Sequence, residues 1–501
     1  MSSPAPVREA DARHSVRSAL TSPRLLRTEV LAGLVVAIAL IPEAIAFSII
    51  AGVDPRVGLF SSFIMAVVIA FTGGRPAMIT AATGAIALVI APVAREHGLD
   101  YLLATVILGG IFQVTLALLG VARLMRFIPR SVMVGFVNSL AILIFLAQVP
   151  HMVDVPWLVY PMIAGGLAIM VALPKVTKVV PAPLVALVVL TIVTVAFALT
   201  VPDVGDEGEL PDSLPYLLVP NVPLTLETLQ IIAPYALGLA LVGLMESLMT
   251  AKLVDDITDT HSDKSREGRG QGIANIASGF FGGMGGCAMI GQTMINVKAS
   301  GARTRISTFL AGVFLLVLVV GMGDLVAIIP MAALVAVMIV VSVATFDWHS
   351  IHPSTLRRMP KSETFVMVST VAVVVATHNL AIGVVVGVIV AMVMFARRVA
   401  HFTQVVRVEQ SDPGVRVYKV EGELFFASSN DLVYQFDYAD DPDTVVIDMS
   451  ESHIWDASTV AALDAIETKY AAKGKTVDIQ GLNEASLDRH RRLAGHLGAG
   501  H

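Results

Sequence analysis

A glutamate in the middle of an apolar stretch is the residue of this chain best suited to chemistry. The stretch covers residues 31–50 and carries Glu43 directly after Pro42. A charged side chain at the bilayer centre costs at least about 2.5 kcal/mol, so it faces a water-filled cavity, pairs with another group or carries a proton. Proline breaks the helical hydrogen-bond ladder at the same depth, and a broken helix beside an acid is typical of secondary transporters. A buried, permanently protonated structural glutamate is the alternative.

The composition indicates a membrane protein with many spans. Of the 501 residues, 55% are hydrophobic and 15% are charged, whereas soluble domains carry roughly 25% charged residues. A single cysteine, Cys287, excludes an internal disulfide framework. Apolar stretches between polar breaks predict fourteen segments, at 29–50, 57–72, 77–94, 101–122, 130–150, 157–174, 179–201, 229–252, 270–284, 287–298, 304–322, 324–346, 362–378 and 380–398.

The basic residues give these segments an orientation. With a cytoplasmic N-terminus, the leader (1–28) and the inner loops hold 23 Lys and Arg, and the outer loops hold 2. This split follows the positive-inside rule and places both termini in the cytoplasm. No cleavable signal peptide is apparent in the leader. The long outer loop, 202–228, is acidic and holds no base.

After the last segment the pattern changes to that of a small soluble domain. Residues 402–425 alternate apolar and polar side chains around a Pro-Gly turn, which predicts a hairpin. Residues 443–450 and 476–482 are short apolar runs typical of buried parallel strands, and each is followed by a stretch with helical spacing. Strand, helix, strand, helix predicts an α/β domain over 402–495.

Three motifs, in order along the chain, resemble the sulfate permease (SulP) family of anion transporters. PEAIAFSIIAGVDPRVGLFSSF (42–63) is similar to the family signature around its first segment, VGLMESLMTAK (242–252) to its E-S-L helix, and residues 270–305 to its G-x-x-N and G-A-R-T-R stretch. The tail resembles the STAS domain of that family, with Asp456 and Ser458 in its loop. The resemblance covers about residues 25–495.

The resemblance implies a membrane all-α transporter with a cytoplasmic α/β STAS domain. Its fourteen segments form two inverted repeats of seven, here 29–201 and 229–398, arranged as a core domain and a gate domain. Segments three and ten are half-helices whose N-termini face each other near the midplane. Glycine-rich stretches precede both segments, at 72–76 and 282–286, and such paired interruptions point to a transporter site. Two helix N-termini hold an anion without any lysine.

The resemblance also implies the residues of the site. The expected substrate-binding residues come from segments one, three and ten: Glu43, Phe47, Thr83, Gly84, Ile290, Gly291 and Gln292. Thr83 and Gln292 would donate hydrogen bonds and Phe47 would cover the substrate, although simple packing explains Thr83 and Phe47 too. The chain departs from the family pattern with Glu43 where many members have Gln, and with Gly291-Gln292 where many have Ser-Arg. An acid beside an anion predicts that proton and anion bind together.

Other polar residues have weaker assignments. Glu246, on the eighth segment, is an ion ligand or a structural anchor, and anchoring is favoured. Glu267, flanked by Arg266 and Arg269, is interpreted as a loop salt-bridge residue. Ser458 is a candidate regulatory phosphorylation site, but a helix-capping role for Asp456 or Ser458 is favoured.

The sequence therefore predicts a secondary active transporter of a small anion, with proton-coupled symport of a fumarate-like dicarboxylate by alternating access. A bicarbonate or sulfate carrier coupled to another ion, an exchanger or a channel are alternatives on the same fold, and a membrane-anchored signalling protein is an alternative of another class. No metal cluster, nucleophile motif or P-loop supports an enzyme. We expect no cofactor and no nucleic acid, a homodimer in a bacterial inner membrane, and a cytoplasmic partner as one use of the STAS domain.

Overall fold

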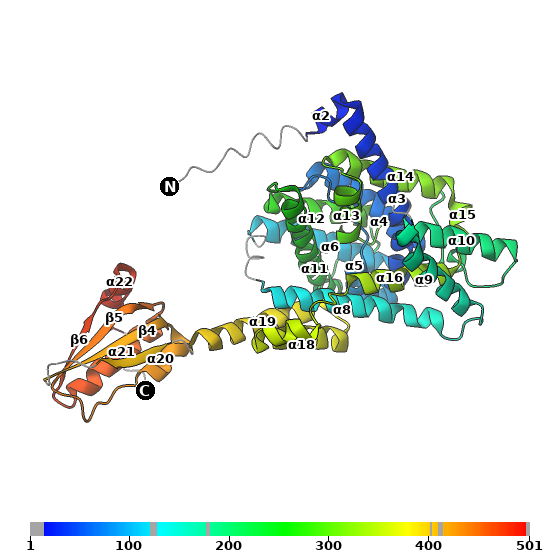
Figure 1. Ribbon diagram of the computed structural model, residues 1–501. Coiled ribbons are helices and arrows are strands. Elements are labelled where there is room, and N and C mark those ends of the chain that lie inside the picture. The colour runs from blue at the N-terminus through cyan, green and yellow to red at the C-terminus, as the bar shows by residue number, and fades with distance from the viewer. Residues whose placement is uncertain (1–14, 121–127, 177–180, 401–402, 409–413, 497–501) are drawn as a thin grey trace. The chain divides into compact units, whose positions relative to one another are not determined.

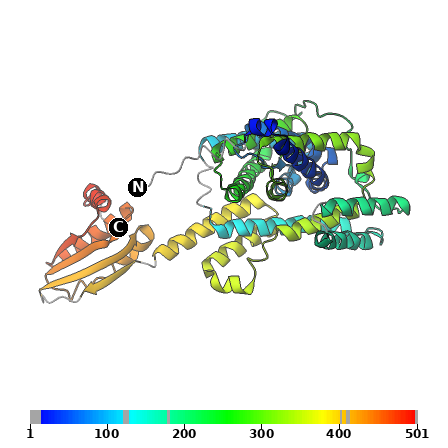
Figure 2. The ribbon, with the colours of Figure 1, turned by 45° about the horizontal axis from the view of Figure 1, so that its top comes forward.

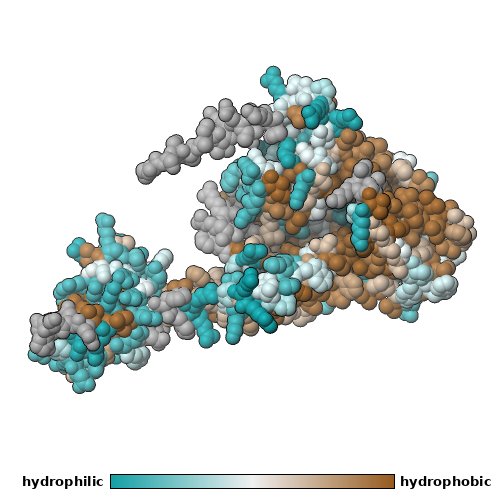
Figure 3. All heavy atoms as spheres, in the orientation of Figure 1, coloured by the Kyte–Doolittle hydropathy of each residue, from teal (hydrophilic) through white to brown (hydrophobic). Residues whose placement is uncertain are grey.

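The computed structural model describes residues 15–120, 128–176, 181–400, 403–408 and 414–496. It divides into two compact units, residues 1–388 and 389–501. The first unit is a set of apolar helices, and its surface in Figure 3 is largely brown. Among the described residues, seven helices are long and apolar enough to cross a membrane, and three shorter apolar helices accompany them. The chain is therefore a multi-pass membrane protein, while the count of fourteen segments stays a prediction.

The helices of the first unit, labelled in Figure 1, pack as two bundles, which Figure 2 shows as separate layers. We call the first the core bundle. Its elements are α3 (Pro23–Ala51), α4 (Pro55–Thr72), β1 (Thr80–Ala81), α5 (Gly84–His97), α6 (Leu99–Leu118), α11 (Leu226–Thr258), α12 (Lys264–Phe280), β2 (Cys287–Ala288), α13 (Ile290–Met294), η4 (Ile295–Ala299) and α14 (Arg305–Gly321).

We call the second the gate bundle. It comprises α8 (Arg130–Gln148), α9 (Val159–Val176), α10 (Ala182–Ala196), α16 (Met331–Thr345), α18 (Lys361–Thr377) and the first residues of α19 (Leu380–Ala400). Shorter elements lie before or between the spans: α2 (Val16–Thr21), η2 (Val149–Met152), η3 (Val204–Glu207), α15 (Gly323–Ala327) and α17 (Pro353–Arg358).

Local sequence signals explain several helix ends. Pro23 and Pro55 stand in the first turns of α3 and α4, where a missing N–H costs nothing. Gly52 ends α3 in a left-handed conformation, with φ of 78°, which glycine adopts without strain. Pro42 lies inside α3 one residue before Glu43 and removes one ladder hydrogen bond there.

The second unit contains a four-stranded sheet of order β3-β4-β5-β6. β3 (Gln404–Val408) pairs antiparallel with β4 (Val415–Leu424), which confirms the predicted hairpin, whose turn lies outside the described residues. β4, β5 (Thr444–Ile454) and β6 (Thr476–Gln480) are parallel. The parallel arrangement of β5 and β6 was predicted, and that of β4 was not. Three helices accompany them: α20 (Phe426–Leu432), α21 (Ala457–Ala471) and α22 (Glu484–Leu493). The short α20 was not predicted.

Candidate substrate-binding site

A cavity of about 330 Å³ lies between the core bundle and the gate bundle. Its walls include six of the seven predicted substrate-binding residues. The seventh, Gln292, is 3% exposed and hydrogen-bonds to Glu43 in the wall. The structure therefore gathers the whole predicted set, from α3, α5 and α13, around one hollow. Their roles in binding stay predictions.

Two very short strands bring the two half-helices together. β1 pairs antiparallel with β2, with Thr80 opposite Ala288 and Ala81 opposite Cys287. Each strand runs within a few residues into a helix that begins at the cavity, α5 after β1 and α13 after β2. The first N–H groups of a helix have no partner within that helix. Two sets of such donors therefore begin at the wall of the same cavity.

Glycines allow the two strands to approach closely. A Cβ on Gly286 would lie 1.9 Å from the carbonyl oxygen of Ala81, far inside contact distance. Asn275 of α12 holds the same glycine, because its side chain accepts from the Gly286 N–H at 2.8 Å and donates to the Gly286 carbonyl at 3.1 Å. Gly282 and Gly285 have φ of 74° and 72°, a region that favours glycine. The second glycine-rich stretch is thus required by the backbone.

Glu43 and Gln292 form a direct link between α3 and α13. Nε2 of Gln292 donates a hydrogen bond to Oε1 of Glu43 at 3.0 Å. Within the described part of the chain, Oε1 of Gln292 is buried and accepts no hydrogen bond. An amide presents either its nitrogen or its oxygen after a rotation of half a turn. Gln292 can therefore donate to an ionised Glu43 or accept from a protonated one.

A second acid, Glu246 of α11, lines the same cavity. The thiol of Cys287 donates to Oε2 of Glu246 at 2.7 Å, and the Thr83 hydroxyl lies 3.1 Å from the same sulfur. Thr83 also caps α5 by accepting from the Ile86 N–H. This chain of contacts joins α11, β2 and α5. The anchoring role of Glu246 stays a prediction. No motif or spacing in the sequence indicated that Cys287 would bridge these residues.

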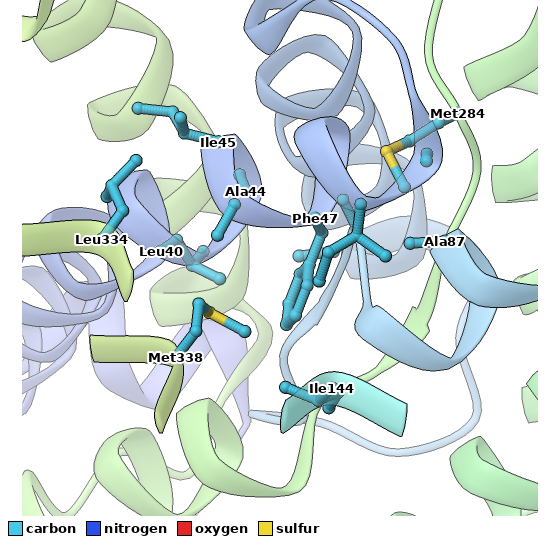
Figure 4. Packing of buried hydrophobic residues seen from close by; sticks show 14 of the residues in the cluster. Leu40, Ala44, Ile45, Phe47, Ala87, Ile144, Met284, Leu334 and Met338 are labelled. Atoms are coloured by element: carbon cyan, nitrogen blue, oxygen red, sulfur yellow. The ribbon is translucent and has the colours of Figure 1, made fainter. Parts of the chain in front are cut away.

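Phe47 closes one side of the hollow and is 3% exposed. Figure 4 shows its ring beside α5, with Ile144 of α8 near its edge. A Cβ on Gly84 would lie 2.9 Å from Cε1 of Phe47, so the ring packs directly on that glycine. The predicted covering position of Phe47 fits this packing.

The sequence missed the wall that the gate bundle supplies. Seven residues of α8 and α16 are involved: Phe136, Val137, Leu140, Ile144, Val341, Ala344 and Thr345. They carry no motif and lie in predominantly apolar helices, so only the fold identifies them. The lining contains two carboxylates and no Lys or Arg. Among the described residues, no group of three His, Cys, Asp or Glu is placed to hold a metal ion.

Glu267 corrects one interpretation from the sequence. It is fully buried in α12 and forms no loop salt bridge with its neighbouring arginines. Oε2 accepts from the N–H groups of Gly74 and Arg75 at 2.7 and 2.8 Å, and Oε1 accepts from the Gln271 amide. Gln271 in turn donates to Thr80 of β1. The acid therefore fixes the turn before β1, and the helix that carries it begins earlier than the predicted span.

In the tail, Ser458 is exposed in the first turn of α21. Asp456 is the N-cap of that helix, and its Oδ1 accepts from the Thr459 N–H at 3.1 Å. Of the two capping candidates, Asp456 fills the role. Phosphorylation of Ser458 stays a prediction.

Comparison with known proteins now gives the family. The sequence profile described as "Sulfate permease family" matches residues 26–160 and 157–370, and the STAS domain profile matches residues 407–494. The chain belongs to the sulfate permease family. Members of this family are transporters, not enzymes, and the tail of this one is a STAS domain.

Relatives and solved structures agree with this assignment. YbaR of Bacillus subtilis, which carries the name of a sulfate transporter, is 53% identical over 94% of this chain and 97% of its own length. The bicarbonate transporter BicA of Picosynechococcus is 27% identical over 89% of this chain and 87% of its own.

Two solved structures share the fold. The transmembrane domain of a cyanobacterial BicA matches with a TM-score of 0.62 and 26% identity, over 73% of this chain and 97% of that one. The murine solute carrier 26 family member A9 anion transporter, in an inward-facing state, matches with a TM-score of 0.80 and 17% identity, over 93% and 87%.

Proposed function

We propose that this sulfate permease family member moves a small anion across the membrane together with a proton, and that Glu43 carries the proton. The observation that supports this most strongly is the hydrogen bond from Gln292, at the start of α13, to Glu43 in the wall of the cavity. The anion would lie among the first N–H groups of α5 and α13, where the helix dipoles favour negative charge.

The charges of the cavity require the proton. An anion beside ionised Glu43 and Glu246, with no Lys or Arg in the lining, would face only like charges among the lining side chains. Protonation of Glu43 removes one of them and adds a donor. Because a bound proton increases the affinity of the site for the anion, a bound anion increases the affinity for the proton by the same factor. Gln292 has a hydrogen bond to offer in both states, so the pair need not separate during the cycle.

The bundles provide the movement in this proposal. The core bundle carries Glu43, Thr83, Glu246 and Gln292, and the gate bundle contributes a wall that is apolar except for Thr345. Displacement of the core bundle along that wall would expose the cavity to each side in turn. The alternating-access cycle, the homodimer and cytoplasmic termini in a bacterial inner membrane are parts of the same proposal.

The substrate has two groups of candidates. Gln292 stands where many family members have Arg, and Glu43 stands where many have Gln. Both differences favour a carboxylate substrate such as a fumarate-like dicarboxylate, although the relatives give this choice no support. The names of YbaR and BicA favour sulfate and bicarbonate. A cavity of about 330 Å³ is compatible with each of these small anions.

The test is uptake of labelled fumarate, sulfate, bicarbonate and chloride into proteoliposomes under an inward proton gradient. Wild type is compared with Glu43→Gln and with Glu96→Gln, a control that removes an exposed carboxylate outside the cavity lining. We expect one anion to accumulate with the gradient in wild type and control, and to equilibrate without accumulation in Glu43→Gln. Accumulation that persists in Glu43→Gln would refute the assignment of the proton site. Uptake that ignores the gradient but needs a counter-anion would identify an exchanger.

A further inference from the structure

A second cavity, of about 310 Å³, lies at the junction of the two bundles. We call it the seam groove. Its walls are formed by α3, at Ile38, Ile41 and Pro42, by the face of α10 that includes Leu187 and Val188, and by residues 322–329 around α15. All its lining side chains except Thr191 are apolar. The Thr191 hydroxyl donates to the Leu187 carbonyl at 2.8 Å, so its proton is already used within α10.

The groove opens onto an exposed apolar surface of the membrane unit. Its residues Val188, Ile192 and Leu325 are 48%, 60% and 55% exposed, although each is a large hydrophobic residue. Val188 and Ile192 lie on the apolar helix α10, and Leu325 lies in α15. A water molecule needs two to four polar partners, which this lining does not offer. An anion or a peptide backbone would lack partners for the same reason. An acyl chain from the surrounding bilayer is apolar and needs no hydrogen-bond partner in the groove.

We propose that the seam groove holds one acyl chain of a membrane phospholipid, and that the bound chain favours the relative position of the bundles seen here. The second half rests on the proposed transport cycle. α3 belongs to the core bundle and α10 to the gate bundle, while α15 is part of the connection from α14 to α16. Relative displacement of the bundles would change the shape of the groove, so an acyl chain would bind more tightly to one arrangement of the bundles than to the other. Such differential binding increases the population of the arrangement that binds the chain more tightly.

Pro42 ties the groove to the substrate cavity. It lines the groove, and the next residue, Glu43, lines the cavity. Adjacent residues in one turn of α3 therefore line the seam groove and the substrate cavity. A chain in the groove contacts α3 at the depth where proline has already removed a backbone hydrogen bond.

The binding half is tested with the full chain in vesicles that contain a phospholipid with a diazirine in the middle of one acyl chain. After illumination, mass spectrometry locates the labelled residues. We expect labels on groove residues of α10 and α3 in wild type. Val188→Trp fills the groove, and labelling there should fall about tenfold, because the displaced chain loses several buried methylene contacts. Val189→Trp is the matched control, since Val189 is 38% exposed on the same helix but does not line the groove.

Absence of labels from the groove in wild type, or equal labelling in the two tryptophan variants, would overturn the binding half. This readout requires no transport, so it stands even when the proposed function fails. The regulatory half is tested by anion uptake. A tryptophan that stays in the groove should slow uptake by Val188→Trp severalfold relative to Val189→Trp. Equal rates in the two variants would overturn that half and leave the groove as a lipid site alone.

Discussion

Gly286→Ala is expected to separate the two strands that bring the half-helices together. The added Cβ would lie 1.9 Å from the Ala81 carbonyl oxygen and 2.6 Å from its carbon. Ordinary contact begins at 3.4 Å, so the backbones must separate by about 1.5 Å. Both clashing atoms belong to backbone and no side chain can rotate away. Overpacking of this kind costs about 1–3 kcal/mol.

The displacement also reaches the site. α5 and α13 begin within a few residues of the pair, so their N-termini would move by a similar distance. Misplacement of functional groups by 1 Å can reduce activity about 100-fold. We therefore expect uptake by Gly286→Ala to fall by roughly one to two orders of magnitude, with a lower melting temperature.

The assay is initial-rate uptake in proteoliposomes together with thermal unfolding in detergent. Gly165→Ala is the control, because Gly165 lies inside α9 and a Cβ there meets nothing within 4 Å. It should keep the wild-type rate and gain slightly in stability, as Ala does over Gly in a helix. Wild-type uptake and unaltered melting in Gly286→Ala would show that the strand pair yields without cost, and the reasoning would be wrong.

Three further predictions concern buried polar groups. Glu29 accepts from the N–H groups of Arg303, Thr304 and Ser307, which lie before and in the first turn of α14. Glu29→Gln should lower the free energy of unfolding by about 1.5–3 kcal/mol. Its melting temperature should be lower than that of the exposed control Glu227→Gln. Tyr470 donates to the buried Asp441 at 2.6 Å; Tyr470→Phe should destabilise the STAS domain by about 1–3 kcal/mol, and unchanged hydrogen exchange in β4 and β5 would contradict this. Burial raises the pKa of Tyr438 to about 12, above roughly 10 for an unfolded chain. Because the folded pKa is the higher one, its contribution is complete below pH 10 and is lost as the pH rises through 12; circular dichroism of the STAS domain across that window is the check.

The sequence predicts much of this protein because its signals are local. The secondary-structure elements can be predicted without any knowledge of packing. The signals are the helix periods, the positions of proline and glycine, and the alternation in residues 402–425. Glu43 attracts attention because burying a charge in lipid is costly wherever the rest of the chain lies. The contact of Gln292 with Glu43 was not predictable from spacing, since the two residues are 249 positions apart. The resemblance to a family supplied their proximity, and the fold supplied their hydrogen bond.

Other features depend on three-dimensional packing alone. Glu267 was assigned to neighbouring arginines because they are adjacent in sequence, but its partners are backbone N–H groups that no residue type reveals. Phe136 and Ile144 are ordinary apolar residues of an apolar helix, and only the junction of two bundles gives them a place in the cavity. Cys287 was set aside as a lone cysteine, although its thiol contacts both Glu246 and Thr83.

The two-residue strand pair has a consequence for how the protein is made. Ile79 and Thr293, which hydrogen-bond next to the pair, are 214 residues apart. A ribosome adds about 5–20 residues per second, so roughly ten to forty seconds pass between the synthesis of Ile79 and that of Thr293. During that time β1 has unpaired backbone groups and no complete cavity exists. Assembly of the site is therefore a late event in biogenesis, completed only after Thr293 has been synthesised.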